Sequence, residues 1–181
     1  MKTRFQLAVV ALAALAAAAP AAAAPAAAAD EARPQFGFGV AVVPTVQPMK
    51  TVELYVPIQV APNLRIEPSL GIAVDNGPSG GTDKRDVTLG VGGFLVKRLG
   101  PSLDLQLGGR LKLNFAKVSS PGVSESGVDF LLAGAAGGEF YLMPRFSAGI
   151  EGDLGIYSNS KASGDNGGLY TTGLVFLRLY L

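Results

Sequence analysis

Several stretches of this chain alternate between apolar and polar side chains with a period of two residues. Along residues 103–115, one parity reads Leu103, Leu105, Leu107, Gly109, Leu111, Leu113 and Phe115, and the other reads Asp104, Gln106, Gly108, Arg110, Lys112 and Asn114. Successive side chains of a β-strand point to opposite faces. The pattern therefore predicts a strand with one apolar face and one charged face.

The same alternation recurs and predicts eight antiparallel strands. We expect them at residues 35–43, 51–60, 64–75, 86–96, 103–117, 128–142, 146–157 and 169–181. Most of them reach the length of about 9–11 residues that a tilted membrane-spanning strand needs. Short connections alternate with longer polar ones at 44–50, 76–85, 119–127 and 158–168. Short inner turns and longer outer loops are typical of outer-membrane barrels.

Two kinds of barrel fit this alternation, a soluble one with an apolar core and a membrane one with an apolar exterior. Apart from Lys117 at the end of the strand 103–117, the apolar parity carries no charge in the expected strands, whereas the other parity mixes a few charges with Gly, Ala and Ser. A basic residue at mid-depth on the lipid face costs about 2–4 kcal/mol. The pattern thus favours an all-β, eight-stranded antiparallel up-and-down transmembrane β-barrel. A soluble lipocalin-like periplasmic carrier is the alternative.

The polar parity supplies the charges that such a barrel would enclose. Because buried charges are normally paired, we expect a salt-bridged network in the lumen, in which Arg110 reaches Glu139 or Glu151. Its expected members are Glu53, Arg65, Glu67, Asp104, Arg110, Lys112, Glu139, Glu151, Asp153 and Arg178. On the apolar parity, phenylalanines near the strand ends predict aromatic girdles. These are Phe36, Phe38, Phe140 and Phe146 at the inner side and Phe115 and Phe130 at the outer side.

The composition excludes several kinds of chemistry. The 181 residues include neither His nor Cys, which removes thiol chemistry and the commonest general base and metal ligand. Glu151 and Asp153 have the groups for acid–base work, but pairing with interior cations is the preferred interpretation. Acidic, Gly-rich stretches at 75–86 and 164–168 lack the spacing of a calcium loop. We therefore expect no catalytic residue, cofactor or metal, and a net charge of +1 gives no reason to expect nucleic acid.

The first 29 residues are typical of a secretory signal peptide. Lys2 and Arg4 precede the apolar segment 5–19, and small residues follow up to Ala29. Pro20 and Pro25 interrupt the apolar stretch, which argues against an uncleaved membrane anchor. We expect cleavage after residue 29 and a single barrel domain over residues 30–181.

Taken together, the alternation, the eight strands and the terminal strand Thr171–Leu181 resemble the small outer-membrane β-barrel family. This eight-stranded group includes the transmembrane domain of outer-membrane protein A and the outer-membrane protein X type. The resemblance implies an integral outer-membrane protein of a Gram-negative cell envelope, exported by its signal peptide. Its implied partners are outer-membrane lipids and lipopolysaccharide, periplasmic chaperones and the assembly machinery that reads the last strand. That strand usually ends in an aromatic residue, whereas this chain ends in Leu181.

The function implied by the resemblance is non-enzymatic. The barrel would contribute to envelope structure or present extracellular loops, whose partner the sequence does not disclose. A narrow channel for small solutes is the alternative, although eight strands leave an interior about filled by side chains. A lipid-acting enzyme is disfavoured because such sites generally depend on His.

Membrane placement is testable by fractionation. Because the expected outward face is apolar, the mature protein should pellet with outer membranes and need detergent for extraction. Immunodetection of the separated fractions measures this, and recovery as a soluble periplasmic monomer would contradict the sidedness.

Overall fold

The computed structural model describes residues 35–43, 51–78 and 81–181, and the expected signal peptide over residues 1–29 lies outside them. Apart from one short helix, the regular structure of this part consists of strands. They are β1 (Gly37–Val43), β2 (Thr51–Tyr55), β3 (Ile58–Ala61), β4 (Leu64–Asp75), β5 (Asp83–Arg98), β6 (Leu103–Ser120), β7 (Val123–Met143), β8 (Phe146–Ser158) and β9 (Gly167–Tyr180). A 3₁₀ helix, η1 (Lys161–Ser163), lies between β8 and β9. None of the described helical structure is long and apolar enough to cross a membrane.

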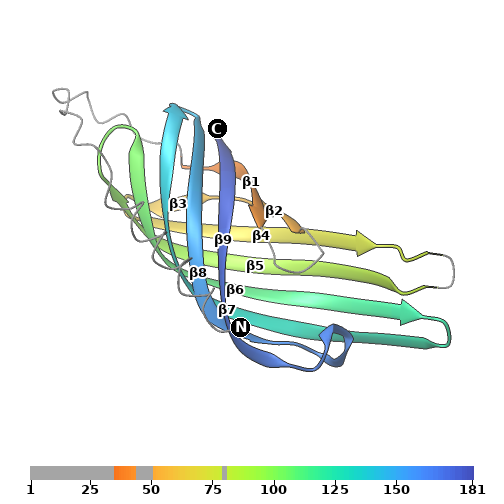
Figure 1. Cartoon of the computed structure of the whole chain (residues 1–181). Coiled ribbons are helices and arrows are strands. Elements are labelled where there is room, and N and C mark those ends of the chain that lie inside the picture. Colours follow the sequence, from red (N-terminus) through yellow and green to blue (C-terminus); the bar gives the residue numbers. More distant parts are fainter. Residues whose placement is uncertain (1–34, 44–50, 79–80) are drawn as a thin grey trace, which may run out of the picture. The chain divides into compact units, whose positions relative to one another are not determined.

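The strands form one closed antiparallel sheet (Figure 1). The strands are hydrogen-bonded in the order β2-β1-β9-β8-β7-β6-β5-β4-β3, and an additional pairing of β2 with β4 completes the ring. The pairing of the first strand with the last leaves no free edge. Because β2 and β3 are two pieces of one strand, the predicted eight-stranded barrel is confirmed.

The break between β2 and β3 has a local cause. Pro57 has no N–H to donate, and it lies opposite the part of β4 that contains Pro68. The strands pair on either side of the break, with Tyr55 opposite Ser69 and Ile58 opposite Ile66. Val56 N–H still donates to the carbonyl of Pro68 at 3.0 Å. The two prolines therefore both lie at this interruption, and each lacks a backbone donor.

The apolar parity faces outward throughout the described wall. Leu107 and Leu154 expose 64% and 62% of their surface, whereas their sequence neighbours Gln106 and Asp153 expose 3% and 5%. A soluble lipocalin-like carrier would require the reverse arrangement, with its charges outside. The alternation in the sequence thus predicted correctly which face of the sheet points outward. The apolar exterior is the surface that lipid would cover.

The barrel has one end of tight turns and one end of longer hairpins. The turns join β3 to β4 at Pro62–Asn63, β5 to β6 at residues 99–102 and β7 to β8 at Pro144–Arg145. The hairpins β4–β5, β6–β7 and β8–β9 project from the opposite end, at the right of Figure 1. The alternation of short and long connections predicted this arrangement.

The prediction of one loop is wrong. Residues 119–127 were expected to be irregular, but β6 continues to Ser120 and β7 begins at Val123. Only Pro121 and Gly122 turn the chain, and Gly122 has the positive φ of 80° that glycine adopts readily. The polar composition of this stretch does not prevent pairing, because a strand that protrudes from the lipid needs no apolar face.

The expected girdle residues lie on the outward face. Phe38 and Phe140 are about half exposed at the turn end, and Phe36 meets Phe38 edge-on at a centroid distance of 5.1 Å. Phe115 and Phe130 are exposed toward the hairpin end, whereas Phe146 is half-buried. The structure therefore places aromatic rings near both ends of the apolar wall.

The two faces can be tested with one pair of lysines at nearly the same depth. Leu154→Lys would place a cation in lipid, at a cost of about 2–4 kcal/mol near mid-depth. Thr172→Lys would place it in the lumen opposite Asp153, its cross-strand partner. We expect the first change to lower the yield of folded barrel strongly and the second to lower it little. Folded yield by gel mobility measures both. Equal losses, or a larger loss from Thr172→Lys, would contradict this assignment of the two faces.

Candidate functional site in the barrel interior

The structure places all ten of the expected lumen charges inside the barrel. Each of them exposes 9% of its surface or less. They come from β2, β4, β6, β7, β8 and β9, so they approach the barrel axis from all round the wall. The closure of the sheet therefore brings together charges that are up to 111 residues apart in sequence, as in the contact of Arg178 with Glu67.

The cluster nearest the turn end is built around Glu139. Its Oε2 accepts from Arg65 Nη1 at 2.5 Å and from Arg178 Nη1 at 2.8 Å. Its Oε1 accepts from Ser147 Oγ at 2.5 Å and from the Tyr180 hydroxyl at 2.7 Å. Four donors thus surround one carboxylate, which is fully buried.

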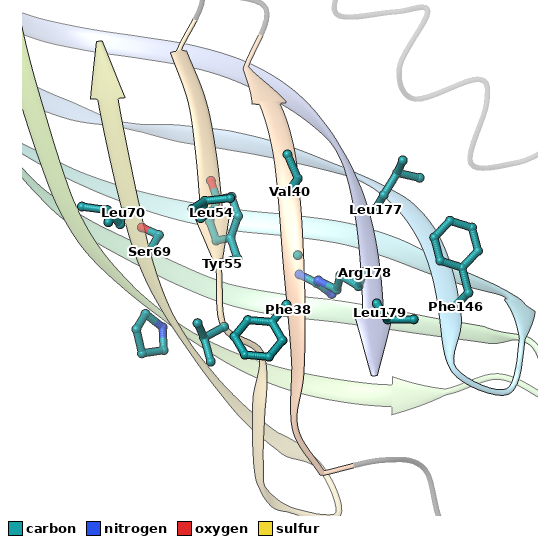
Figure 2. A pocket seen from close by; sticks show the side chains of 13 residues that line it. Phe38, Val40, Leu54, Tyr55, Ser69, Leu70, Phe146, Leu177, Arg178 and Leu179 are labelled. Atoms are coloured by element: carbon teal, nitrogen blue, oxygen red, sulfur yellow. The ribbon is translucent and has the colours of Figure 1, made fainter. Parts of the chain in front are cut away.

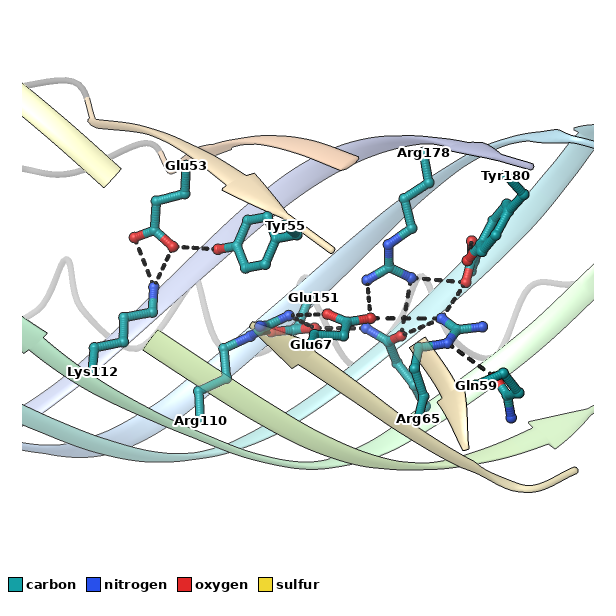
Figure 3. Close-up of polar contacts among 12 residues, drawn as sticks. Glu53, Tyr55, Gln59, Arg65, Glu67, Arg110, Lys112, Glu151, Arg178 and Tyr180 are labelled. Carbon is teal, nitrogen blue, oxygen red and sulfur yellow. Dashed lines mark hydrogen bonds and ion pairs between the residues drawn. The ribbon is translucent and has the colours of Figure 1, made fainter. Parts of the chain in front are cut away.

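The next level of the interior continues the same chain of ion pairs. Arg178 Nη2 donates to Glu67 at 2.6 Å, and Arg110 Nη2 donates to the other oxygen of Glu67 at 2.9 Å. Arg110 also holds Glu151 through its Nε and Nη2 atoms, and Gln106 Nε2 donates to Glu151 at 2.6 Å. Figure 3 shows this chain, in which each arginine in the middle links two carboxylates.

A separate ion pair and several rings occupy the level toward the hairpin end. Lys112 Nζ lies 2.8 Å from both oxygens of Glu53, and the Tyr55 hydroxyl donates to Glu53 at 2.5 Å (Figure 3). The Arg110 guanidinium lies 4.7 Å from the ring centroids of Tyr55 and Phe94. These cation–π contacts place aromatic rings between the ion pairs of the two levels.

These contacts settle how the interior charges are arranged. Arg110 contacts Glu151, one of its two expected partners, and Glu67, while Glu139 is held by Arg65 and Arg178 instead. Removing one member of a buried pair leaves its partner uncompensated, which typically costs 3–5 kcal/mol. The network therefore ties the strands to one another across the lumen.

Two further expected members, Asp104 and Asp153, are buried inside the barrel beside this chain of ion pairs. Asp104 is opposite Glu139 in the register of β6 and β7 and is 3% exposed. Asp153 lies two residues from Glu151 on β8, and its Oδ1 makes no hydrogen bond within the described residues. Among those residues, no group of three His, Cys, Asp or Glu side chains is placed to hold a metal ion.

Asp129 of β7 is a site residue that sequence reasoning missed. It is 3% exposed and accepts from Asn114 Nδ2 at 2.9 Å, from the Ser160 N–H and hydroxyl at 2.7 Å each, and from the Ser163 hydroxyl at 2.6 Å. These bonds fasten the β8–β9 connection to the barrel wall. A Cβ atom on the nearby Gly127 would lie 2.3 Å from Ser160, so glycine leaves room for this contact. The sequence did contain a signal for this residue, because Asp129 lies on the inward parity of its strand, as the expected lumen charges do.

The outer wall also carries a groove of about 550 Å³, shown in Figure 2. It lies over β1, β2, β4 and β9, and the residues that line it are mainly apolar and belong to the outward parity. They include Phe38, Val40, Leu54, Leu70, Leu177 and Leu179. The groove therefore lies mainly on the apolar exterior, although Tyr55, Ser69 and Arg178 of the inward parity also line it.

Comparisons with known proteins agree with this architecture. The sequence model of a family described as outer membrane protein beta-barrel domain matches residues 9–176. The comparison with curated proteins found no match.

Three solved structures illustrate the similarity in fold. Neisserial surface protein A has a TM-score of 0.56 at 15% identity, over 81% of this chain and 94% of that one. Ail, the attachment invasion locus protein of Yersinia pestis, has 0.53 at 18% identity over 80% and 94%, in a complex with the heparin analogue sucrose octasulfate. The N-terminal barrel domain of Pseudomonas aeruginosa OprF has 0.56 at 12% identity over 81% and 98%. At these identities the similarity concerns the fold alone.

The role of Asp129 can be tested by limited proteolysis. Asp129→Ala removes the acceptor of all four bonds, and a hydrogen bond to a charged group is worth about 1.5–3 kcal/mol. We expect trypsin to cleave after the exposed Lys161 at least about tenfold faster, because local opening of the connection becomes easier. Asp165→Asn, in the same connection, should leave the rate unchanged. Equal rates for the parent and Asp129→Ala would contradict the anchoring role.

Proposed function

This chain belongs to the family of outer membrane protein β-barrel domains, and on that premise we propose that it is a non-enzymatic barrel with a closed lumen. In this proposal it is exported by the signal peptide at residues 1–29 and inserted by the outer-membrane assembly machinery. It strengthens the envelope and presents its hairpins outside the cell. The observation that carries the proposal is the chain of ion pairs from Arg65 to Glu151 across the interior.

The filled interior argues against the alternative of a narrow solute channel. An eight-stranded barrel encloses a space that side chains can fill, and here arginines, carboxylates and rings occupy successive levels of it. A passing ion would have to displace Arg110 from Glu67 or Glu151. Separating such a pair in a dry interior leaves uncompensated charges, so spontaneous opening is disfavoured.

The occupied carboxylates support a non-enzymatic role. Acid–base catalysis needs a group that can reach a substrate and exchange a proton with it. Glu139 is surrounded by four donors, and Glu67 and Glu151 are each held by arginine. The chain contains no His that could serve instead.

The hairpin end supports the presentation of loops. The β6–β7 hairpin continues as paired strands past the apolar wall, and Asp129 fastens the β8–β9 connection. Segments that are already ordered lose less conformational entropy when they bind a partner. A rigid display of this kind suits recognition outside the cell.

Conductance in planar bilayers tests the closed lumen. We expect little or no current from the parent protein. Arg110→Ala should raise the current, because it removes the donor that Glu67 and Glu151 share and opens space beside Tyr55 and Phe94. Lys161→Ala, which removes a cation from an exposed connection, should leave the current unchanged. Large, stable single-channel currents from the parent protein would contradict the proposal and favour the channel.

A further inference from the structure

Two cations lie side by side on the lipid-facing surface at the hairpin end. Arg85 of β5 and Lys117 of β6 are direct partners in the register of these strands. Both are exposed and both lie on the outward parity. Their next neighbours in the same row are Val74 of β4 and Ser126 of β7, so this row of four strands contains no acid.

The row immediately below is fully apolar. It consists of Ile72, Val87, Phe115 and Val128, which are paired in register across the same four strands and are 60%, 39%, 44% and 53% exposed. The step from apolar to cationic therefore takes two residues along each strand, or about 7 Å. This is the place on the wall where acyl chains would end and lipid headgroups would begin.

Within the part of the chain that the structure describes, the side chains of these two cations have no partner. Neither side chain has an ion pair or hydrogen bond among the described residues. Asp83 lies one row further out on the same face of β5, where its Oδ1 accepts the Gly77 N–H at 3.1 Å. Lys84 and Asp86 flank Arg85 but belong to the opposite parity. Like charges directly opposite one another destabilise a sheet. An anion bound between Arg85 and Lys117 would therefore relieve the repulsion between these two side chains.

We infer that Arg85 and Lys117 together bind the phosphate of an anionic lipid in the outer leaflet. Arginine can engage two phosphate oxygens at once, while the lysine adds a mobile point charge. The acyl chains of the same lipid would lie along the apolar row below. This inference rests on the outer-membrane orientation of the proposed function, but neither on the closed lumen nor on loop presentation.

The test compares two double variants that remove the same charge. Arg85→Gln/Lys117→Gln removes the outward pair. Lys84→Gln/Lys161→Gln removes two exposed cations, one adjacent to Arg85 on the opposite parity and one in η1. The folded full-length barrel in a nonionic detergent is titrated with bisphosphorylated lipid A, and bound lipid is counted by native mass spectrometry. Each basic residue near an anionic lipid surface contributes roughly fivefold in affinity, so the outward pair should account for about 25-fold.

The expected result is a loss of this size in the first double variant and parent-like affinity in the second. Arg85→Lys, which keeps the charge, should retain most of the binding. Lipid A stripped of its phosphates should bind the parent and both double variants equally weakly, and millimolar inorganic phosphate should not compete. Parent-like affinity of Arg85→Gln/Lys117→Gln, an equal loss in the control, or effective competition by free phosphate would each overturn the inference. The conductance of the parent protein tests the closed lumen separately.

Discussion

The constraint on which the structure depends is that backbone donors and acceptors inside a bilayer have no water to satisfy them. A sheet meets this constraint only when it closes, because an open edge would expose a row of unpaired N–H and C=O groups. The pairing of β1 with β9 is therefore the contact that makes the other strands possible in lipid. Pro57 and Pro68, which lack backbone donors, both lie at the interruption between β2 and β3.

Closure has a second consequence, since it turns one face of the sheet into a narrow interior. Long charged side chains fit there only where the residues around them have small side chains or none. A Cβ atom on Gly92, the cross-strand partner of Arg110, would lie 3.0 Å from its guanidinium and 2.6 Å from the Phe94 ring. A Cβ atom on Gly149 would lie 2.2 Å from the Phe176 ring. The abundance of glycine on the polar parity is thus the steric complement of the arginines and rings.

The alternation of side chains was enough to predict the strands and their faces, because each depends on residues close together in sequence. Residues 64–75 were expected as a strand and form β4 with those bounds. The individual ion pairs were harder to predict, because they depend on the stagger of strands that face one another across the lumen. Arg110 was expected to reach Glu139 or Glu151, but its contact with Glu67 follows only from the three-dimensional register.

In the protruding hairpins, the alternation of apolar and polar side chains no longer predicts the structure. Between residues 119 and 127 the chain has no apolar parity, so nothing in its composition distinguishes a paired strand from a loop. Asp129 was overlooked for a related reason. It shares the inward parity of Glu139, but its partners Ser160 and Ser163 come from an irregular connection whose path no periodicity reveals.

Charge has opposite consequences on the two faces of the same strands. Arg110 and Lys117 are both basic residues of β6, seven positions apart, so they fall on opposite parities. Arg110 lies among carboxylates that the closed sheet supplies, and its charge is neutralised within the protein. Lys117 faces outward beside Arg85, where the sheet supplies no acid in the same row. Inside the barrel the fold itself provides the counter-charge, whereas at the outer rim the counter-charge has to come from the surrounding membrane.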